Sequence, residues 1–262
     1  MHSLRVLVAF LRVGVLNIVQ YRSDFVLAVA NAVISLLTQA LGLSVIFANT
    51  SDLRGWTADA MLVLIGIHFF ISGLVGLVLR PSMEALMEGI RLGTFDFLLT
   101  KPADAQLLAA SQRVAPQALT DVVVGLLVVA LAVSRGQADL DLVSVALFLV
   151  TLASGFAIIC AFLLVLSTMA FWFVKLDNIL VIFQALFGNA GRWPVSIFPG
   201  WMRPVLTFVV PIAFAVTVPA QALTGQLSLS GALASLAVAA LFVTGSRVFW
   251  LVALRRYTGA SA

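Results

Sequence analysis

The chain has few charged residues and a single cysteine. Only 10% of its 262 residues are charged, whereas 62% are hydrophobic; a soluble domain has about 25% charged residues. A soluble protein is therefore excluded. Cys160 alone cannot form an intrachain disulfide, which excludes a secreted disulfide scaffold. The apolar runs are continuous rather than alternating, which excludes a membrane β-barrel and predicts an all-α membrane protein.

Motifs that would give the chain a chemistry of its own are also missing. No G-x-x-x-x-G-K-[ST] loop occurs, so the usual cradle for ATP is absent. Neither H-E-x-x-H nor G-x-S-x-G occurs, which removes the commonest signatures of intramembrane hydrolases. We therefore expect no catalytic residue, metal or cofactor on this chain. The net charge of +4 predicts membrane topology rather than a nucleic-acid partner.

Long apolar segments are the main feature that is present. A span needs about 20 mostly apolar residues, and five segments qualify, at 25–48, 60–79, 117–134, 142–166 and 231–254. A sixth, from about 178 to 189, is shorter and can borrow length from the aromatic residues 171–173. Residues 190–224 hold five of the eight prolines. Because Pro211 breaks their short apolar part, 205–219, we predict an outer re-entrant segment there.

The basic residues determine the predicted orientation. With six spans and both termini in the cytoplasm, 11 of the 15 basic residues fall inside and 4 fall outside, namely Arg54, Arg135, Arg192 and Arg203. This asymmetry agrees with the positive-inside rule. Residues 1–24 repeat apolar side chains at three and four residues, which favours an interfacial helix; a plain charged leader is the alternative. Trp172 and Trp250 suit the inner membrane interface as anchors.

A charged loop at 80–116 separates the second and third spans. Residues 82–92 fit a short amphipathic helix that Ser82 caps and Gly93 ends with a positive φ. Asp104 could cap a second helix, and Pro116 suits the first turn of the third span. The loop therefore has the pattern of a folded docking element, with a solvated linker as the alternative.

Two stretches of the sequence resemble a known family. Residues 91–102, RLGTFDFLLTKP, resemble the cytoplasmic loop of type-2 ABC exporter permeases, in the small bacterial six-span branch with a G-T-x-D-x-x-L-x-[KR]-P signature. Residues 192–199, RWPVSIFP, with the prolines that follow, are similar to the outer re-entrant segment of that branch. The likeness extends over nearly the whole chain.

The resemblance implies a fold, a location and partners. It implies a single permease domain in the bacterial inner membrane, which pairs with a second permease, more readily a related chain than a copy. A cytoplasmic ABC ATPase dimer would bind ATP and Mg²⁺ and dock on the loop. The resemblance places Glu84, Glu88, Arg91, Asp96 and Lys101 at or near that contact.

The polar residues inside the spans can be interpreted in two ways. His68, Ser72 and Gly76 share one face of the second span, and Asn31, Ser35, Thr38 and Gly42 share one face of the first. Such stripes allow close helix packing with hydrogen bonds across the contact. The alternative is a polar lining of the substrate route, with Asn31, Thr38, His68 and Ser72 as candidates.

Export driven by a separate ATPase is therefore the favoured function. An ATP-independent secondary transporter or channel, with His68 and Asp121 in a proton path, is the second hypothesis. Such transporters often contain related halves, and no internal repeat stands out here. We read Asp121 as interfacial or paired with a base. A membrane scaffold without transport is a third possibility, which no feature of the sequence favours.

Overall fold

The fold was analysed in a computed structural model that describes residues 22–136, 141–173 and 178–257. Within these ranges the regular structure is helical, apart from one antiparallel bridge between Leu53 and Trp56. Five helices are long and apolar enough to span a membrane, as the sequence predicted. These are α2 (Arg22–Phe47), α3 (Ala58–Leu74) with its continuation, α7 (Leu119–Ser134), α8 (Leu142–Thr168) and α12 (Leu229–Arg256).

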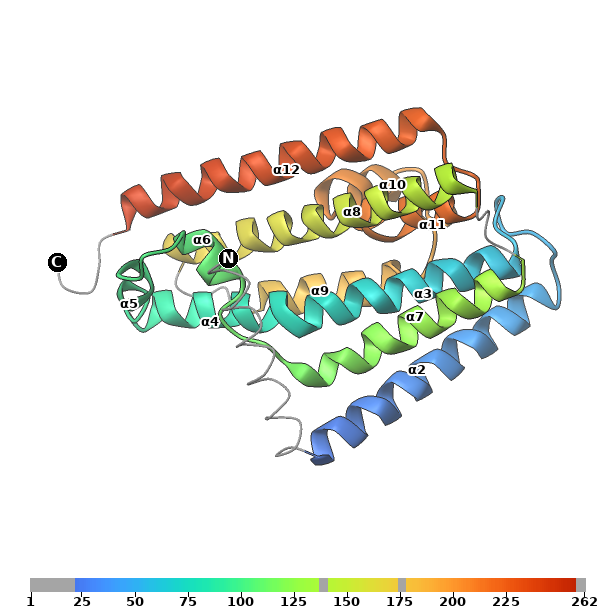
Figure 1. Cartoon of the computed structure of the whole chain (residues 1–262), viewed down its shortest axis with the longest axis horizontal. Coiled ribbons are helices and arrows are strands. Elements are labelled where there is room, and N and C mark those ends of the chain that lie inside the picture. The colour runs from blue at the N-terminus through green and yellow to red at the C-terminus, as the bar shows by residue number, and fades with distance from the viewer. Residues whose placement is uncertain (1–21, 137–140, 174–177, 258–262) are drawn as a thin grey trace.

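The long helices lie roughly side by side in a flattened bundle (Figure 1). Short helices α5 (Asp96–Leu99) and α6 (Ala105–Ala110) lie together at one end, which we call the loop end. The connection between α2 and α3 lies at the opposite end. Helix α2 lies at the edge of the bundle and is mostly exposed. Residues 1–21, most of the predicted interfacial helix, lie outside the described ranges.

The second span runs without interruption into the loop. Helix α3 passes through a π-helical turn, η1 (Val75–Leu79), into α4 (Arg80–Arg91), so that residues 58–91 form one helix of 34 residues. At 1.5 Å per residue this helix is about 51 Å long, longer than the ~30 Å hydrocarbon core. The helix is therefore longer than one crossing of the membrane requires.

The predicted cap at Ser82 is wrong, because the helix does not begin there. The side chain of Ser82 is instead buried and bonded to the other end of the loop: its Oγ donates to Arg113 O at 2.9 Å and accepts from Arg113 N at 3.1 Å. The other residues predicted to begin or end helices in the loop are confirmed. Gly93 has a φ of +71°, Asp104 accepts from two amides of α6, and Pro116 opens the short helix η2 (Pro116–Ala118) before α7.

Helices α3 and α7 meet through glycines. A Cβ added to Gly125 would lie 2.4 Å from Phe70 N and 2.7 Å from Gly66 O, and one added to Gly73 would lie 2.5 Å from Val122 N. Small residues let two backbones approach this closely. The stripe on α2 does not pack in this way, since a Cβ on Gly42 would meet nothing within 4 Å.

The predicted sixth span is the short helix α9 (Ile179–Ala190). Its 12 residues rise only about 18 Å, so it does not cross the core by itself. It does not borrow length from residues 171–173, because Phe171 ends η3 (Met169–Phe171), the continuation of α8. Beyond α9 the chain reaches the opposite end, where Arg54 Nη1 donates to Ser196 O at 2.9 Å.

The proline-rich segment is helical but broken. Residues Met202–Val209 and Ala213–Leu223 form two helical pieces with a bend of 78° between them. The first contains α10 (Met202–Pro204) and η5 (Val205–Val209); the second contains η6 (Ala213–Thr217) and α11 (Val218–Leu223). Val210, before Pro211, is extended at φ −117° and ψ 94°, as a residue before proline prefers. The predicted break at Pro211 is confirmed, and a membrane re-entrant path stays a prediction.

Candidate functional site

A polar cavity of about 700 Å³ lies among α2, α3, α7 and α9. Its end nearest the loop is lined by Arg80, Glu84, Gln117 and Asp121. The part at His68 and Arg192, about half-way along α3, is called its deep end, and Gln39 and Gln184 also line the cavity. Alanine, valine, leucine and phenylalanine side chains complete the wall. The cavity can therefore hold a molecule with both polar and apolar parts.

His68 lies at the deep end and joins α3 to α9. The ring is 4% exposed, stacks on Phe187 with a centroid separation of 5.4 Å, and places Nε2 3.2 Å from Phe187 O. Since a carbonyl only accepts, Nε2 carries the proton in this contact. Ser72 Oγ lies 3.5 Å from the same nitrogen, and Nδ1 has no partner.

The structure brings three of the four predicted path residues together. Asn31, His68 and Ser72 line the cavity, whereas Thr38 does not. The hydroxyl of Thr38 donates to Ile34 O at 2.8 Å on an exposed part of α2. Asp121 also lines the cavity, and no base pairs with it among the described residues. The structure therefore does not show the predicted pairing of Asp121 with a base, and its interfacial position stays a prediction.

Two of the predicted coupling residues form ion pairs inside the chain. Glu84 accepts from Arg80 at 2.8 Å, one helical turn away, and Glu88 accepts from Arg113 at 3.2 Å, across the loop. These pairs are about half exposed and each contributes little stability. Glu84 also lines the cavity, so this one side chain lies at both the loop and the mouth of the cavity.

The other three predicted coupling residues lie further out along the loop. Arg91 and Lys101 are exposed, and Asp96 is partly buried beside the phenol of Tyr257. Burial, and then the hydrogen bond to Asp96, raises the pKa of Tyr257. Contact of these residues with an ATPase stays a prediction. The loop also exposes Phe97 and Leu107, at 73% and 71%, which the sequence analysis did not single out.

An arginine on the last span fixes the position of the loop. Arg247 of α12 donates two hydrogen bonds to the carboxylate of Asp104, at 2.6 and 3.1 Å, and a third to Gln106 Oε1 at 2.9 Å. Bidentate pairs of this kind are geometrically specific. The hydrogen bond from Arg247 is the largest cause that lowers the pKa of Asp104, followed by amide donors of α6.

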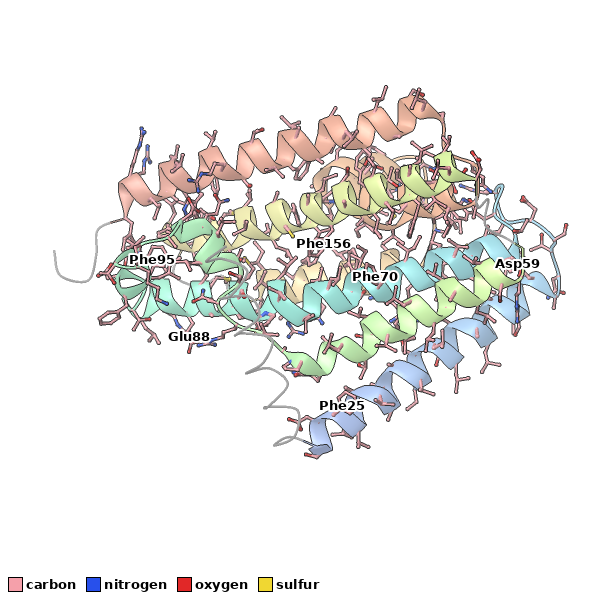
Figure 2. All side chains as sticks on the ribbon, in the orientation of Figure 1. Phe25, Asp59, Phe70, Glu88, Phe95 and Phe156 are labelled. Atoms are coloured by element: carbon pink, nitrogen blue, oxygen red, sulfur yellow. The ribbon has the colours of Figure 1, made fainter. Side chains whose placement is uncertain are left out.

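An aromatic cluster beside this pair holds the loop against α12. Trp250 is 1% exposed, and Phe95 and Phe171 both lie edge-on to it, at centroid separations of 6.0 and 5.9 Å. Tyr257 packs edge-on to the same two phenylalanines, 5.4 Å from each. Figure 2 shows Phe95 at the loop end, close to Glu88 and far from Asp59. The loop is thus a folded part of the bundle rather than a linker.

Comparison with known proteins identifies the family. A sequence model described as "ABC-2 family transporter protein" matches residues 33–261, which is most of the chain. The chain belongs to this family. It is therefore a multi-pass membrane protein and the membrane part of a transporter, which is not itself catalytic. No curated protein and no solved structure matched the chain.

The site lies largely within the part that defines the ABC-2 family. His68, Ser72, Arg192 and the whole loop fall inside the matched residues, whereas Asn31 lies just before them. Within the described part of the chain, no group of three or more potential metal ligands occurs. The residues that line the cavity offer hydrogen bonds, charge and apolar contact.

The pair between Asp104 and Arg247 gives a pH-dependent attachment of the loop. Because its pKa is below the ordinary 3.8 in the folded protein, Asp104 contributes stability that is fully present above pH 3.8 and lost as the pH falls through the lowered value. We expect Trp250 fluorescence to change over that acidic range. Asp104→Asn should remove most of this change, and Asp52→Asn, at the opposite end, should leave it. An identical titration in Asp104→Asn would contradict the assignment.

Proposed function

We propose that this ABC-2 protein forms the translocation route of an ATP-binding-cassette exporter and is driven by a separate ATPase docked on residues 80–116. The observation that carries the proposal is the single helix from Ala58 to Arg91. It joins the wall of the polar cavity, at His68 and Ser72, to the folded loop. A force on the loop therefore acts on the cavity through a rigid element.

The docking surface in this proposal combines charge with exposed apolar side chains. Glu84, Glu88, Arg91, Asp96 and Lys101 provide charges that orient a partner, while Phe97 and Leu107 provide apolar area. ATP and Mg²⁺ are bound by the partner in this scheme, because the chain has no phosphate-binding loop.

The remaining parts of the proposal follow from the family and from charge. The loop and both termini lie on the cytoplasmic side of the bacterial inner membrane, because that orientation places 11 of the 15 basic residues on the cytoplasmic side. A second permease, related rather than identical, completes the route. Asn31, His68 and Ser72 line the cavity that would form this route, and Thr38 does not.

Phe97→Asp tests the docking. It places a charge in the apolar part of the proposed contact, so we expect the ATPase to bind at least about tenfold more weakly, a change of ~1.4 kcal/mol. The measurement is co-purification of a P-loop subunit from native membranes, followed by its affinity for the purified permease. Gln226→Asp, an exposed change outside the loop, is the matched control. If Phe97→Asp bound the ATPase as tightly as wild type, Phe97 would not be part of the contact.

One observation favours the ATP-independent alternative, since His68 and Asp121 line the same cavity. Vesicles containing only this chain distinguish the two functions. Substrate movement driven by a proton gradient without any ATPase would support the alternative, whereas movement that needs ATP and the co-purified subunit supports an exporter.

A further inference from the structure

Three residues that line the cavity carry unpaired polar atoms. Within the described residues six buried side-chain polar atoms have no hydrogen-bond partner, and three of these belong to cavity-lining residues: Gln39 Oε1, His68 Nδ1 and Arg192 Nε. A buried polar group without a partner costs about 1–3 kcal/mol. Native proteins satisfy such groups. Each of the three atoms has less than 1 Å² of accessible surface, so a ligand in the cavity would satisfy them only after the side chains turn toward it.

Arg192 supplies an uncompensated positive charge at this place. It follows Gly191, where a Cβ would lie 2.8 Å from Cδ2 of His68, so the arginine is level with a residue half-way along the second span. No carboxylate pairs with Arg192 among the described residues. Charged groups at membrane depth are costly and mark substrate or ion pathways. An anionic group of the substrate is the natural partner of Arg192.

The other two unpaired atoms are acceptors. Gln39 Nε2 donates to Ser35 O at 3.2 Å, which fixes the amide and leaves Oε1 free to accept. His68 uses Nε2–H on Phe187 O, so in the neutral ring Nδ1 also accepts. A ligand that satisfies all three atoms carries an O–H or N–H donor as well as a negative charge. The rest of the wall includes Phe69, Phe183 and Phe187, which suit an apolar body.

We propose that the deep end of the cavity binds an amphipathic organic anion, with its acidic group on Arg192 and a neighbouring hydroxyl or N–H group donating to Gln39 and His68. The inference rests on the proposed function in taking this cavity as the transport route, and it adds the chemical class of the cargo. A phosphate monoanion or a glycerol-phosphate headgroup has this combination; a quaternary ammonium has neither part.

A series of ligands with one chain length tests the proposal. Purified permease in nanodiscs of neutral phosphatidylcholine is titrated at pH 6 with decyl phosphate, decyl sulfate and decyltrimethylammonium, and empty nanodiscs are subtracted. We expect decyl phosphate to bind tightest, since it has both charge and hydroxyl. Decyl sulfate, an anion without a donor, should bind more weakly, and the cation weakest. Preference for the cation would overturn the proposal.

Variants then assign the binding to the named side chains. Arg192→Gln should weaken decyl phosphate about 10- to 100-fold, as expected for a lost charged hydrogen bond, and Arg192→Lys should weaken it less. Arg203→Gln, an exposed arginine on the following segment, should leave affinity unchanged. Equal binding by wild type and Arg192→Gln would overturn the proposal.

Gln39→Leu keeps the test decisive if Arg192→Gln does not fold. This variant retains the charge of Arg192 and removes one acceptor, so it should reduce the preference for phosphate over sulfate while anion binding persists. An unchanged preference would contradict the role of Gln39. Normal elution on size exclusion and an unchanged melting temperature establish that each variant is folded.

The source of the anion is decided by changing the lipid. If phosphatidylglycerol in the nanodisc competes with decyl phosphate in wild type but not in Arg192→Lys or Arg192→Gln, the occupant is a lipid headgroup. If it does not compete, the occupant is a soluble organic acid. These measurements use the permease alone, so they succeed or fail independently of ATPase docking, which Phe97→Asp tests.

Discussion

Replacing Trp250 by alanine is expected to lower the free energy of unfolding by about 3–5 kcal/mol, the usual cost of truncating a large buried aromatic residue. Trp250 is 1% exposed and is the contribution of α12 to the cluster with Phe95 and Phe171. Its loss should therefore separate the loop from α12 as well as destabilise the protein. Any activity transmitted from the loop should fall with it.

The measurement is thermal unfolding in detergent, followed with a thiol-reactive dye that reports exposure of the single cysteine, Cys160. Trp201→Ala is the matched control, because Trp201 is 71% exposed and should change stability by less than about 0.5 kcal/mol. Trp250→Phe should lie between the two. Equal melting temperatures for Trp250→Ala and Trp201→Ala would show that the cluster does not hold the loop.

Gly125→Ala is expected to destabilise the bundle by about 3 kcal/mol, the upper part of the usual range for overpacking. The added methyl group would meet only backbone nearby, with Phe70 N at 2.4 Å and Gly66 O at 2.7 Å. Backbone atoms cannot rotate aside as a side chain can. Helices α3 and α7 must therefore separate, and the part of the cavity wall that they form must shift.

Gly42→Ala provides the control for Gly125→Ala. The same methyl group on α2 meets nothing within 4 Å, and alanine is the better helix former by about 1 kcal/mol. Gly42→Ala should therefore unfold at the same temperature as wild type or slightly higher. If both substitutions were tolerated equally, the glycine contact between α3 and α7 would not be what holds these helices together.

The spans were predictable because length and hydropathy determine them directly. The predicted run at 142–166 corresponds to α8 at Leu142–Thr168, and the run at 231–254 to α12 at Leu229–Arg256. Gly93, Asp104 and Pro116 were predictable for the same kind of reason, since each acts on the backbone within a few residues of itself. Local signals of this type do not need the partner helix to be known.

The missed features all depend on contacts between residues distant in sequence. Trp250 fits a membrane anchor by its position near the end of a span, whereas in the fold Phe95 of the loop and Phe171 cover it. From the sequence, Ser82 fits the cap of a new helix. In the structure, the helix of the preceding span continues through it. Arg192 was counted with the outer charges, because the sequence does not show that α9 ends beside His68. The cavity is assembled from four helices and has no linear signature.

The close contacts of Gly66 and Gly73 also hold the middle of the long helix of the second span against α7. Arg91 lies about 37 Å along the helix axis from Gly66, whereas His68 lies only about 3 Å from it. A rocking movement that swings the outer tip by several ångströms would leave the imidazole almost stationary and carry Glu84 most of the way with the tip. On the proposed function, the end of the cavity at Glu84 would widen or narrow while the contacts around His68 kept their geometry.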